Sequence, residues 1–362
     1  MRNTKIALAV LALVASTAAM AESTVYGTLE AAVGNTTGSN NTTKGTYFAG
    51  AGGWVAGNNI GFKGSEDLEG GMKATYQLEA GLNLNSGQSD NGGSGLNSSA
   101  AVASTGPIFS RTATIGLSSE MGTLNLGQQL SPYIAAQAMG TAGNGHFFVN
   151  RIIMGGGSLL AGLHNAAAGS TVSGQGGFFV PNAMSYSTPS IGGISATVLY
   201  AMRNGASGAS IDAADPRNSY IAGMATGTFG DVNVTVGFQD RQNTDKGLTT
   251  SASYTMGPAT LSGNYTKHTE EGATAVNSYS GSLAYKVTDP LTLSLQYARN
   301  NVTNAQTLTN VGAQYGLSKR TSLYATYGRG TNGAQSVYDQ RVAYGANTLS
   351  STSIVAGVIH SF

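Results

Sequence analysis

Groups able to do covalent chemistry are few in this sequence. Histidine occurs four times and cysteine not at all. A hydrolase needs a nucleophile or an activated water with a base within hydrogen-bond reach. No Ser/His/acid arrangement can be recognised around His146, His164, His268 and His360. We therefore expect neither an enzyme nor a protein that binds a cofactor or a metal.

Charged residues at alternate positions favour a different chemistry, the passage of ions and polar solutes along a wet wall. In residues 72–79, Lys73 and Glu79 occupy polar positions of an alternating apolar and polar pattern. Successive side chains of a strand point to opposite faces, and an arginine facing lipid near mid-bilayer would cost about 2–4 kcal/mol. The residues expected to face an aqueous lumen are Glu30, Lys63, Lys73, Glu79 and Arg111.

Three acids gather near the first of these charges. Glu66, Asp67 and Glu69 lie between Lys63 and Lys73. Several oxygen ligands together suit Ca²⁺, but the flanking lysines favour a solvated ion-pair patch at a turn.

The period of two recurs along the chain and predicts β-strands. Residues 232–239 and 291–298, for example, alternate strictly between apolar and polar or small side chains. Each such segment has one apolar and one polar face, and no helical stripe of useful length competes.

Short and long connections alternate between these segments. Seven short turns are indicated at 64–71, 118–122, 189–193, 230–231, 257–258, 288–290 and 318–320. Eight longer polar stretches lie at about 35–52, 83–108, 130–182, 204–218, 240–247, 268–276, 300–306 and 330–349. Seven and eight connections join 16 strands, and this alternation is typical of outer-membrane barrels. We expect an all-β fold, a transmembrane antiparallel β-barrel of 16 strands with long external loops and a water-filled lumen.

Both ends of the sequence point to the bacterial outer membrane. Residues 1–21 have a basic start, an apolar stretch and the small-residue ending Ala19-Met20-Ala21, which predict a signal peptide cleaved after Ala21. Residues 22–362 would then form a single barrel domain. At the other end, residues 354–362 alternate and finish on Phe362. We expect the barrel-assembly machinery to recognise this last strand.

Charge and composition limit the classes of partner that the sequence predicts. Without Arg2 and Lys5, 16 basic residues face 17 acidic ones, so the mature chain has a net charge of −1. This balance gives no reason to expect nucleic acid as a partner. Charged residues are only 10% of the chain, and a barrel whose outer face meets outer-membrane lipid and lipopolysaccharide accounts for this scarcity. A soluble β-sandwich would account for the period of two but not for the scarcity of charge or for the two ends.

Tyrosine supplies 17 residues, many of them near strand ends. Amphipathic rings there fit the aromatic girdles of a barrel. Tyr324 instead has the parity of the lumen. Girdle positions are expected for Tyr26, Tyr186, Tyr265, Tyr285, Tyr297, Tyr315 and Tyr327.

Several short motifs, spread in order over the mature chain, carry a family resemblance. They are residues 25–31 (VYGTLEA), 60–68 (IGFKGSEDL), 110–117 (SRTATIGL), 186–189 (YSTP), 317–324 (LSKRTSLY) and the closing His360-Ser361-Phe362. Together they resemble the general porins of Gram-negative bacteria, particularly the β-proteobacterial branch. The resemblance implies a homotrimer of 16-stranded barrels, each with a third loop folded into the lumen to form a constriction.

The resemblance also bears on the constriction. In the porins that this chain resembles, arginines on the wall oppose carboxylates on the third loop. The match carries over at Arg111, whereas Asn59 and Gln128 occupy positions where arginine is usual. The third loop, residues 130–182, contains no acid, and none lies anywhere in 121–211. Arg151 is the only fixed charge of this loop. Residues 146–151 slightly resemble the segment in which the enterobacterial porins place a further constriction arginine, and this resemblance implies a pore-lining role for Arg151.

These features predict passive diffusion of small hydrophilic solutes through a weakly selective channel that leans toward anions. Arg111 could instead pair with Glu79 or Glu30 in the wall, which would leave selectivity to charges in the loops. The alternatives are a substrate-selective porin for neutral or anionic solutes, and a plugged structural or adhesive barrel, because the third loop is long enough to occlude the lumen.

Overall fold

The computed structural model describes most of the chain that follows the predicted signal peptide. Residues 1–21 lie outside the described residues, as do 140–178 with Arg151 and most of the third loop. The described ranges are 22–38, 45–49, 57–85, 87–90, 108–139, 179–202, 219–242, 245–270, 274–301, 305, 307–331 and 350–362. Within them, no helix is long and apolar enough to cross a membrane.

Eighteen strands and two short helices make up the described chain. The first strands are β1 (Glu22–Gly38), β2 (Gly45–Ala49), β3 (Asn59–Asp67), β4 (Lys73–Asn83), β5 (Gln88–Asp90), β6 (Thr112–Ser119) and β7 (Gly122–Leu130). The next are β8 (Phe179–Ser187), β9 (Ile194–Ala201), β10 (Tyr220–Phe229), β11 (Val232–Arg241), β12 (Asp245–Met256) and β13 (Ala259–Glu270). The last are β14 (Val276–Lys286), β15 (Leu291–Asn300), β16 (Thr307–Gly316), β17 (Thr321–Thr331) and β18 (Ser351–Ser361). The helices are η2 (Glu69–Gly71) and α2 (Pro132–Ala138).

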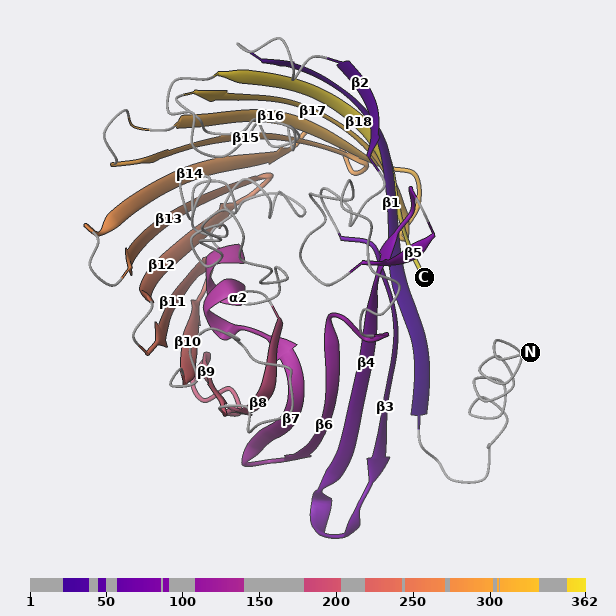
Figure 1. Ribbon diagram of the computed structural model, residues 1–362, viewed down its shortest axis with the longest axis vertical. Helices are drawn as coiled ribbons and strands as arrows, with labels where there is room; N and C mark the ends of the chain where they lie inside the picture. The colour runs from indigo at the N-terminus through magenta and orange to yellow at the C-terminus, as the bar shows by residue number, and fades with distance from the viewer. Residues whose placement is uncertain are drawn as a thin grey trace, which may run out of the picture.

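The strands close into a ring (Figure 1). Each pairs antiparallel with its neighbours, and β1 pairs with β18 to complete the circle. Two of the eighteen strands, β2 and β5, are short and do not take a separate place in the ring. β2 and β3 pair with successive stretches of one edge of β1, and β5 and β6 pair with successive stretches of one edge of β4. The expected closed antiparallel barrel of 16 strands is therefore confirmed.

The seven short turns fall where the sequence predicts them, whereas two long connections differ. β1 continues to Gly38, into the stretch expected as loop. The connection expected at 240–247 is much tighter, because β11 runs to Arg241 and β12 begins at Asp245. An ion pair of 3.0 Å between Asp240 and Lys246 joins the two strands near this turn.

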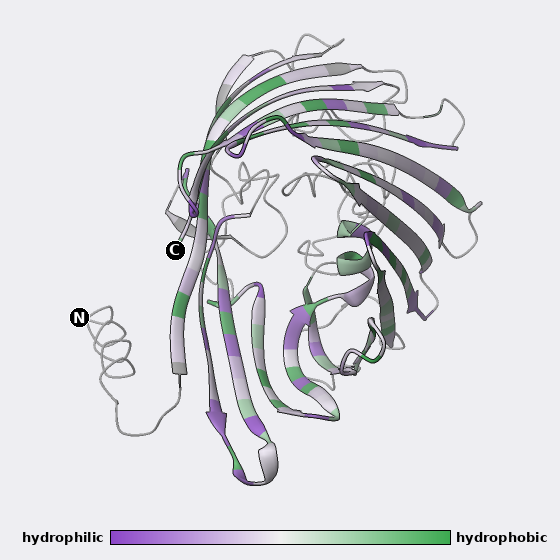
Figure 2. Ribbon diagram, turned by 180° about the vertical axis from the view of Figure 1, so that it is seen from behind, coloured by the Kyte–Doolittle hydropathy of each residue, from purple (hydrophilic) through white to green (hydrophobic). Residues whose placement is uncertain are grey.

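Hydrophilic and hydrophobic residues follow one another along the strands (Figure 2), and this alternation gives each strand two different faces. Large apolar side chains such as Ile115, Leu126, Val236 and Leu295 are exposed on the outer face. The inner face carries Ser, Thr, Asn and Gln, many of them buried. A barrel with this polarity presents its apolar side to lipid.

Helix α2 lies inside the ring (Figure 1). It packs against β10, β11 and β12, and the Ser251 hydroxyl donates to the Ala136 carbonyl at 2.9 Å. Tyr133 and Ile134 of this helix join a buried apolar cluster with inner residues of β8, β9 and β10. The first residues after β7 thus turn inward, while the constriction expected from the third loop falls on residues outside the described ranges.

Candidate functional site

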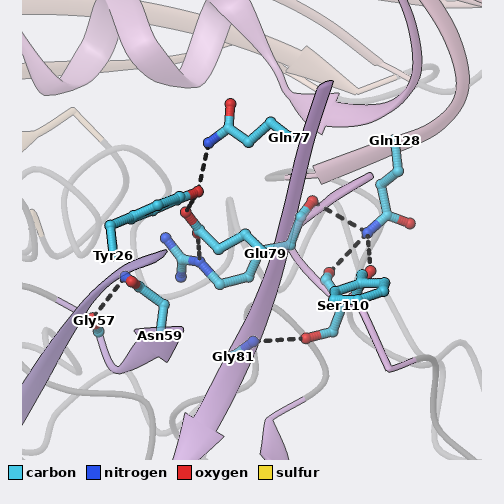
Figure 3. Close-up of polar contacts among 10 residues, drawn as sticks. Tyr26, Gly57, Asn59, Gln77, Glu79, Gly81, Ser110 and Gln128 are labelled. Atoms are coloured by element: carbon cyan, nitrogen blue, oxygen red, sulfur yellow. Dashed lines mark hydrogen bonds and ion pairs between the residues drawn. The ribbon is translucent and has the colours of Figure 1, made fainter. Parts of the chain in front are cut away.

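Strands β1 and β4 and the residue just before β6 bring a tyrosine, an acid and a base together on the inner wall. The Glu79 carboxylate, on β4, accepts a hydrogen bond of 2.8 Å from the Tyr26 hydroxyl of β1 and forms an ion pair with Arg111. The Gln77 amide donates to the same tyrosine oxygen at 2.7 Å (Figure 3). The network is partly buried, which reduces competition from water, and its members hold one another in place.

Arg111 reaches the network because its backbone bends. It precedes β6, whose outward residues include Ile115 and Leu117, so strict alternation would turn Arg111 outward. The Gln128 amide instead donates to the carbonyls of residues 109, 110 and 111 at 3.4, 2.8 and 3.1 Å and holds the bend (Figure 3). The guanidinium then lies 4.8 Å from the ring centre of Phe179, a distance typical of cation–π contact.

A β-bulge places Gln128 for this task. The register of β7 against β8 shifts between Gly127 and Gln129. Gly127 has φ of 120°, and a Cβ there would come within 2.1 Å of the Ala113 carbonyl oxygen, so only glycine fits. In the porins that the sequence resembles, arginine is usual at the position of Gln128, and the structure gives this glutamine a role that the sequence does not indicate.

Glu30 and Asn59 lie near this network but have separate partners. Glu30 is fully buried on the inner face of β1 and accepts a hydrogen bond of 2.6 Å from the Tyr324 hydroxyl of β17. The Asn58 amide donates to the Glu30 carbonyl at 3.1 Å. Asn59 is also buried, and its amide donates to the Gly57 carbonyl at 3.2 Å. Glu30 therefore pairs with a tyrosine, while Arg111 pairs with Glu79.

The two lysines lie toward the first turn and are exposed. Lys63 has its ammonium nitrogen 5.2 Å from the Tyr26 ring centre. Lys73 forms an ion pair of 2.8 Å with Asp67, with both side chains largely in solvent. Among the described residues, no group of three or more possible ligands could hold a metal ion. The charges near the first turn thus include a solvated ion pair.

In the described chain, two further buried residues with titratable or charged side chains lie on the inner face. Arg241 of β11 and His268 of β13 are both buried. Arg241 lies two residues after Gln239, and His268 lies two residues after Thr266, both of which are on the inner face. Strand alternation could therefore have predicted an inner position for Arg241 and His268. Their positions at the ends of strands, in stretches expected as loops, concealed this.

The aromatic residues divide between the two faces. Tyr186, Tyr285, Tyr297, Tyr315 and Tyr327 are exposed on the outer face, where girdle residues belong. The girdle position expected for Tyr26 is wrong, because its hydroxyl is hydrogen-bonded to Glu79 and Gln77 on the inner face.

The inner wall is uneven in charge. Glu30, Lys63, Glu79 and Arg111 lie on β1, β3, β4 and just before β6. The inner residues of β14 to β17, away from the turn end at Lys286, are uncharged in the described chain, and include Ser282, Gln296, Asn310 and Thr326. A closed barrel with an apolar outside and a polar inside defines an outer-membrane channel.

Comparisons with known proteins identify the family to which the chain belongs. A family model for Gram-negative porins matches residues 7–335. The outer membrane porin protein 32 of Delftia acidovorans is 30% identical over 392 aligned residues, which cover 100% of both chains. The chain therefore belongs to the Gram-negative porin family, a family of outer-membrane channel proteins.

Solved structures share the fold. An anion-selective porin from Comamonas acidovorans superposes with a TM-score of 0.68 at 22% identity, over 94% of this chain and 100% of that one. OmpT of Vibrio cholerae in a trimer form gives a TM-score of 0.64 at 14% identity, over 94% and 99%. The protein is an integral outer-membrane porin with a 16-stranded barrel.

Proposed function

We propose that the lumen passes small hydrophilic solutes and ions by passive diffusion, with a weak preference for anions. No covalent step is needed for such conduction. The observation that carries the proposal is the closed barrel with a polar inner wall. Preference for anions is supported by the absence of any acid in residues 121–211, and a solved relative of the same fold is described as anion-selective.

The residues proposed to line the pore are those named from the sequence, with Arg241 added. The inner-face charges that the structure describes include the basic residues Lys63, Lys73, Arg111, Arg241 and Lys286 and the acidic residues Glu30, Asp67 and Glu79. Asn59 is a neutral member of the same wall, and Arg151 is retained from the sequence. Charges of one sign along a wet path raise the local concentration of the opposite ion.

The first test is the reversal potential of the channel in a planar bilayer across a KCl gradient. Because Arg111 and Glu79 are paired, their single substitutions should act in opposite directions. Arg111→Gln leaves a bare carboxylate and should shift selectivity toward cations. Glu79→Gln leaves a bare guanidinium and should shift it toward anions.

The matched control is Arg299→Gln, which removes an outward-facing charge and should leave the reversal potential unchanged. A clear cation preference in the wild type would overturn the proposed anion preference. If neither variant at the pair moves the potential, the loops set selectivity instead. Absence of conductance would favour a plugged structural or adhesive barrel.

A substrate-selective porin for neutral solutes is a second candidate. Gln296, Asn310 and Thr326 place amide and hydroxyl side chains on neighbouring strands of the uncharged wall. Such groups suit hydroxylated solutes. A saturable block of the ion current by a neutral sugar would favour this candidate, and a current that falls only with viscosity would exclude it.

We further propose a homotrimer that contacts outer-membrane lipid and lipopolysaccharide. The trimer form of one structural neighbour supports this assembly. Electrophoresis of unheated and boiled samples should show a trimer that dissociates on heating. A monomeric mass for the unheated protein in mild detergent would contradict it.

We also propose cleavage of the signal peptide after Ala21, leaving one domain at 22–362. In support, residues 1–21 combine a basic start, an apolar stretch and a small-residue ending. N-terminal sequencing of the mature protein should begin at Glu22, and retention of residues 1–21 would contradict the proposal.

A further inference from the structure

The register of Gln128 places it on the outer side of the wall. Gln128 lies opposite Ala113 in the pairing of β6 with β7. Leu124 and Leu126, four and two residues earlier on β7, are exposed on the outer face. Strand alternation therefore gives Gln128 an outward position. A polar amide there needs partners within the protein, because lipid offers none.

The backbone just before β6 supplies these partners. The Gln128 Nε2 lies 2.8 Å from the Ser110 carbonyl oxygen and 3.1 Å from that of Arg111 (Figure 3). Both are normal lengths for such hydrogen bonds, and an amide nitrogen has two hydrogens to donate. From the other side, the Gly81 backbone N–H of β4 donates to the Ser110 hydroxyl at 3.1 Å. Gln128 and Gly81 thus form a clamp on residues 110 and 111.

The clamp controls the face on which Arg111 lies. Thr112, the first residue of β6, is opposite Glu79 on the inner face. An unbent strand would therefore turn the preceding residue outward. Arg111 lies on the inner side instead, where it forms an ion pair with Glu79 and its guanidinium is 4.8 Å from the Phe179 ring centre. An outward Arg111 would leave the Glu79 carboxylate in the wall without its cation.

We propose that Gln128 is a positioning residue for ion selectivity. From the outer side of the wall, its amide keeps the charge of Arg111 in the lumen, where it balances the charge of Glu79. Selectivity depends on the charges that line the path. Loss of the clamp should therefore change selectivity although every charge stays in the sequence. The inference deepens the proposed channel function, and its electrical test rests on that function.

Cysteine labelling tests the clamp without electrical measurement, because the chain contains no cysteine. Arg111→Cys places a single thiol at the bend and removes the ion pair with Glu79, so the direction of residue 111 then depends on Gln128. A charged, membrane-impermeant methanethiosulfonate labels a thiol in an aqueous lumen. A thiol against detergent reacts slowly, because apolar surroundings suppress the reactive thiolate. Mass spectrometry of the full-length barrel in detergent gives the labelling rate.

Gln128→Met keeps a long side chain but removes both donors. Two backbone hydrogen bonds together shift such an equilibrium roughly 10-fold, so R111C/Q128M should label more slowly than R111C by about that factor. Gln314→Met is the matched control, because the Gln314 amide donates to the Ser322 hydroxyl at 2.9 Å and holds no charged residue. R111C/Q314M should label as fast as R111C. Equal rates for R111C and R111C/Q128M overturn the proposal, and so does an unlabelled R111C.

Reversal potentials test the consequence for conduction. Gln128→Met alone should shift selectivity toward cations, in the same direction as Arg111→Gln. In the R111Q background it should cause no further shift, because no charge remains at position 111 to be moved. Equal shifts in the two backgrounds would show that Gln128 acts independently of Arg111 and would overturn the proposal, as would an unchanged potential in Gln128→Met.

The two measurements separate this proposal from the proposed channel function. A wild type that does not conduct would contradict the channel function, whereas the labelling rates would still test the clamp. If Gln128→Met does not give a heat-modifiable barrel, Gln128→Asn replaces it. Its amide is one methylene shorter and does not reach the two carbonyls, so the same slower labelling is expected. An unchanged rate in that variant overturns the proposal as well.

Discussion

At the scale of single residues, tyrosine hydroxyls hold the carboxylates of the inner wall. Tyr26 donates to Glu79 at 2.8 Å and Tyr324 donates to Glu30 at 2.6 Å. A hydrogen bond to a charged group is worth more than one between neutral groups, and its loss leaves a buried acceptor short of a donor. Both acids are therefore held on the wall by partners from other strands.

Removal of the Tyr324 hydroxyl should destabilise the barrel. Tyr324→Phe takes the donor from the buried Glu30 carboxylate, and we expect a loss of about 1–2 kcal/mol in the free energy of unfolding. Urea unfolding in lipid vesicles measures this value. Tyr327→Phe on the same strand is the control, because its ring faces outward, and it should change stability by less than about 0.5 kcal/mol. Equal effects of the two variants would contradict a role for the Glu30 contact.

Strand parity could predict part of the candidate site but not its pairing. Glu79 and Tyr324 lie inside uninterrupted strands, where alternation fixes the face. Arg111 lies outside such a strand, and its direction depends on a bend held by Gln128, a contact between residues 17 to 19 positions apart. No local pattern encodes that contact. Tyr26 was misplaced because an aromatic near a strand end fits either a girdle or an inner network.

At the scale of elements, aromatic rings cover glycines on neighbouring strands. Tyr26 lies opposite Gly61 in the β1–β3 register, and Tyr324 lies opposite Gly357 in β17–β18. A Cβ on Gly61 would lie 2.4 Å from the Tyr26 ring. A ring over a bare backbone buries apolar surface and fixes register, which stabilises sheets that contain glycine. The glycines thus position the tyrosines of the site.

Gly61→Ala should displace Tyr26 and destabilise the barrel by about 1–3 kcal/mol, because the methyl group would overlap a ring whose hydroxyl is hydrogen-bonded to Glu79 and Gln77. The matched control is Gly263→Ala in β13, where the nearest atom lies 3.6 Å from the added Cβ. This control should change stability by less than about 1 kcal/mol. The midpoint of denaturant unfolding in vesicles gives both values. A Gly61→Ala protein as stable as the control would show that the ring moves freely.

The sequence could predict the strands and the short turns, because period two and turn residues act locally. Helix α2 could not be predicted, since seven residues give too few repeats of a helical stripe. Its position depends on contacts with β10 to β12, far along the chain, including Ala136 against Gly237. The sequence likewise could not predict that two places in the ring are each shared by two strands, β2 with β3 and β5 with β6. These divisions depend on where the chain leaves the edge of the neighbouring strand.

At the scale of the whole molecule, the last residue lies at the seam between β1 and β18. Phe362 exchanges backbone hydrogen bonds with Gly27 at 3.0 and 3.2 Å, and its ring lies over that glycine. About a third of its surface is nevertheless exposed. The side chain is thus both part of the seam and open to recognition by the barrel-assembly machinery, which we proposed from the sequence.

Phe362→Ala should separate these two roles. With purified assembly machinery in vesicles, we expect the variant to lose the acceleration of folding that the wild type shows. Spontaneous refolding without the machinery should still reach the heat-modifiable barrel, because the backbone pairing at the seam remains. Phe229→Ala, at the short-turn end of β10, is the control and should be accelerated like the wild type. Full acceleration of Phe362→Ala would contradict recognition through this residue.

We expect the seam between β1 and β18 to be the last part of the barrel to form. Every other junction of the ring joins strands consecutive along the barrel wall, but the Thr28 and Ser361 hydroxyls, 3.1 Å apart across the seam, belong to residues 333 positions apart. Closing a loop of that length costs about 3 kcal/mol more chain entropy than closing a ten-residue hairpin. Contacts so distant in sequence form late. Until then both outer strands present unpaired edges, which template association with other chains. We therefore expect a newly exported molecule to need a chaperone that shields these edges until the barrel closes.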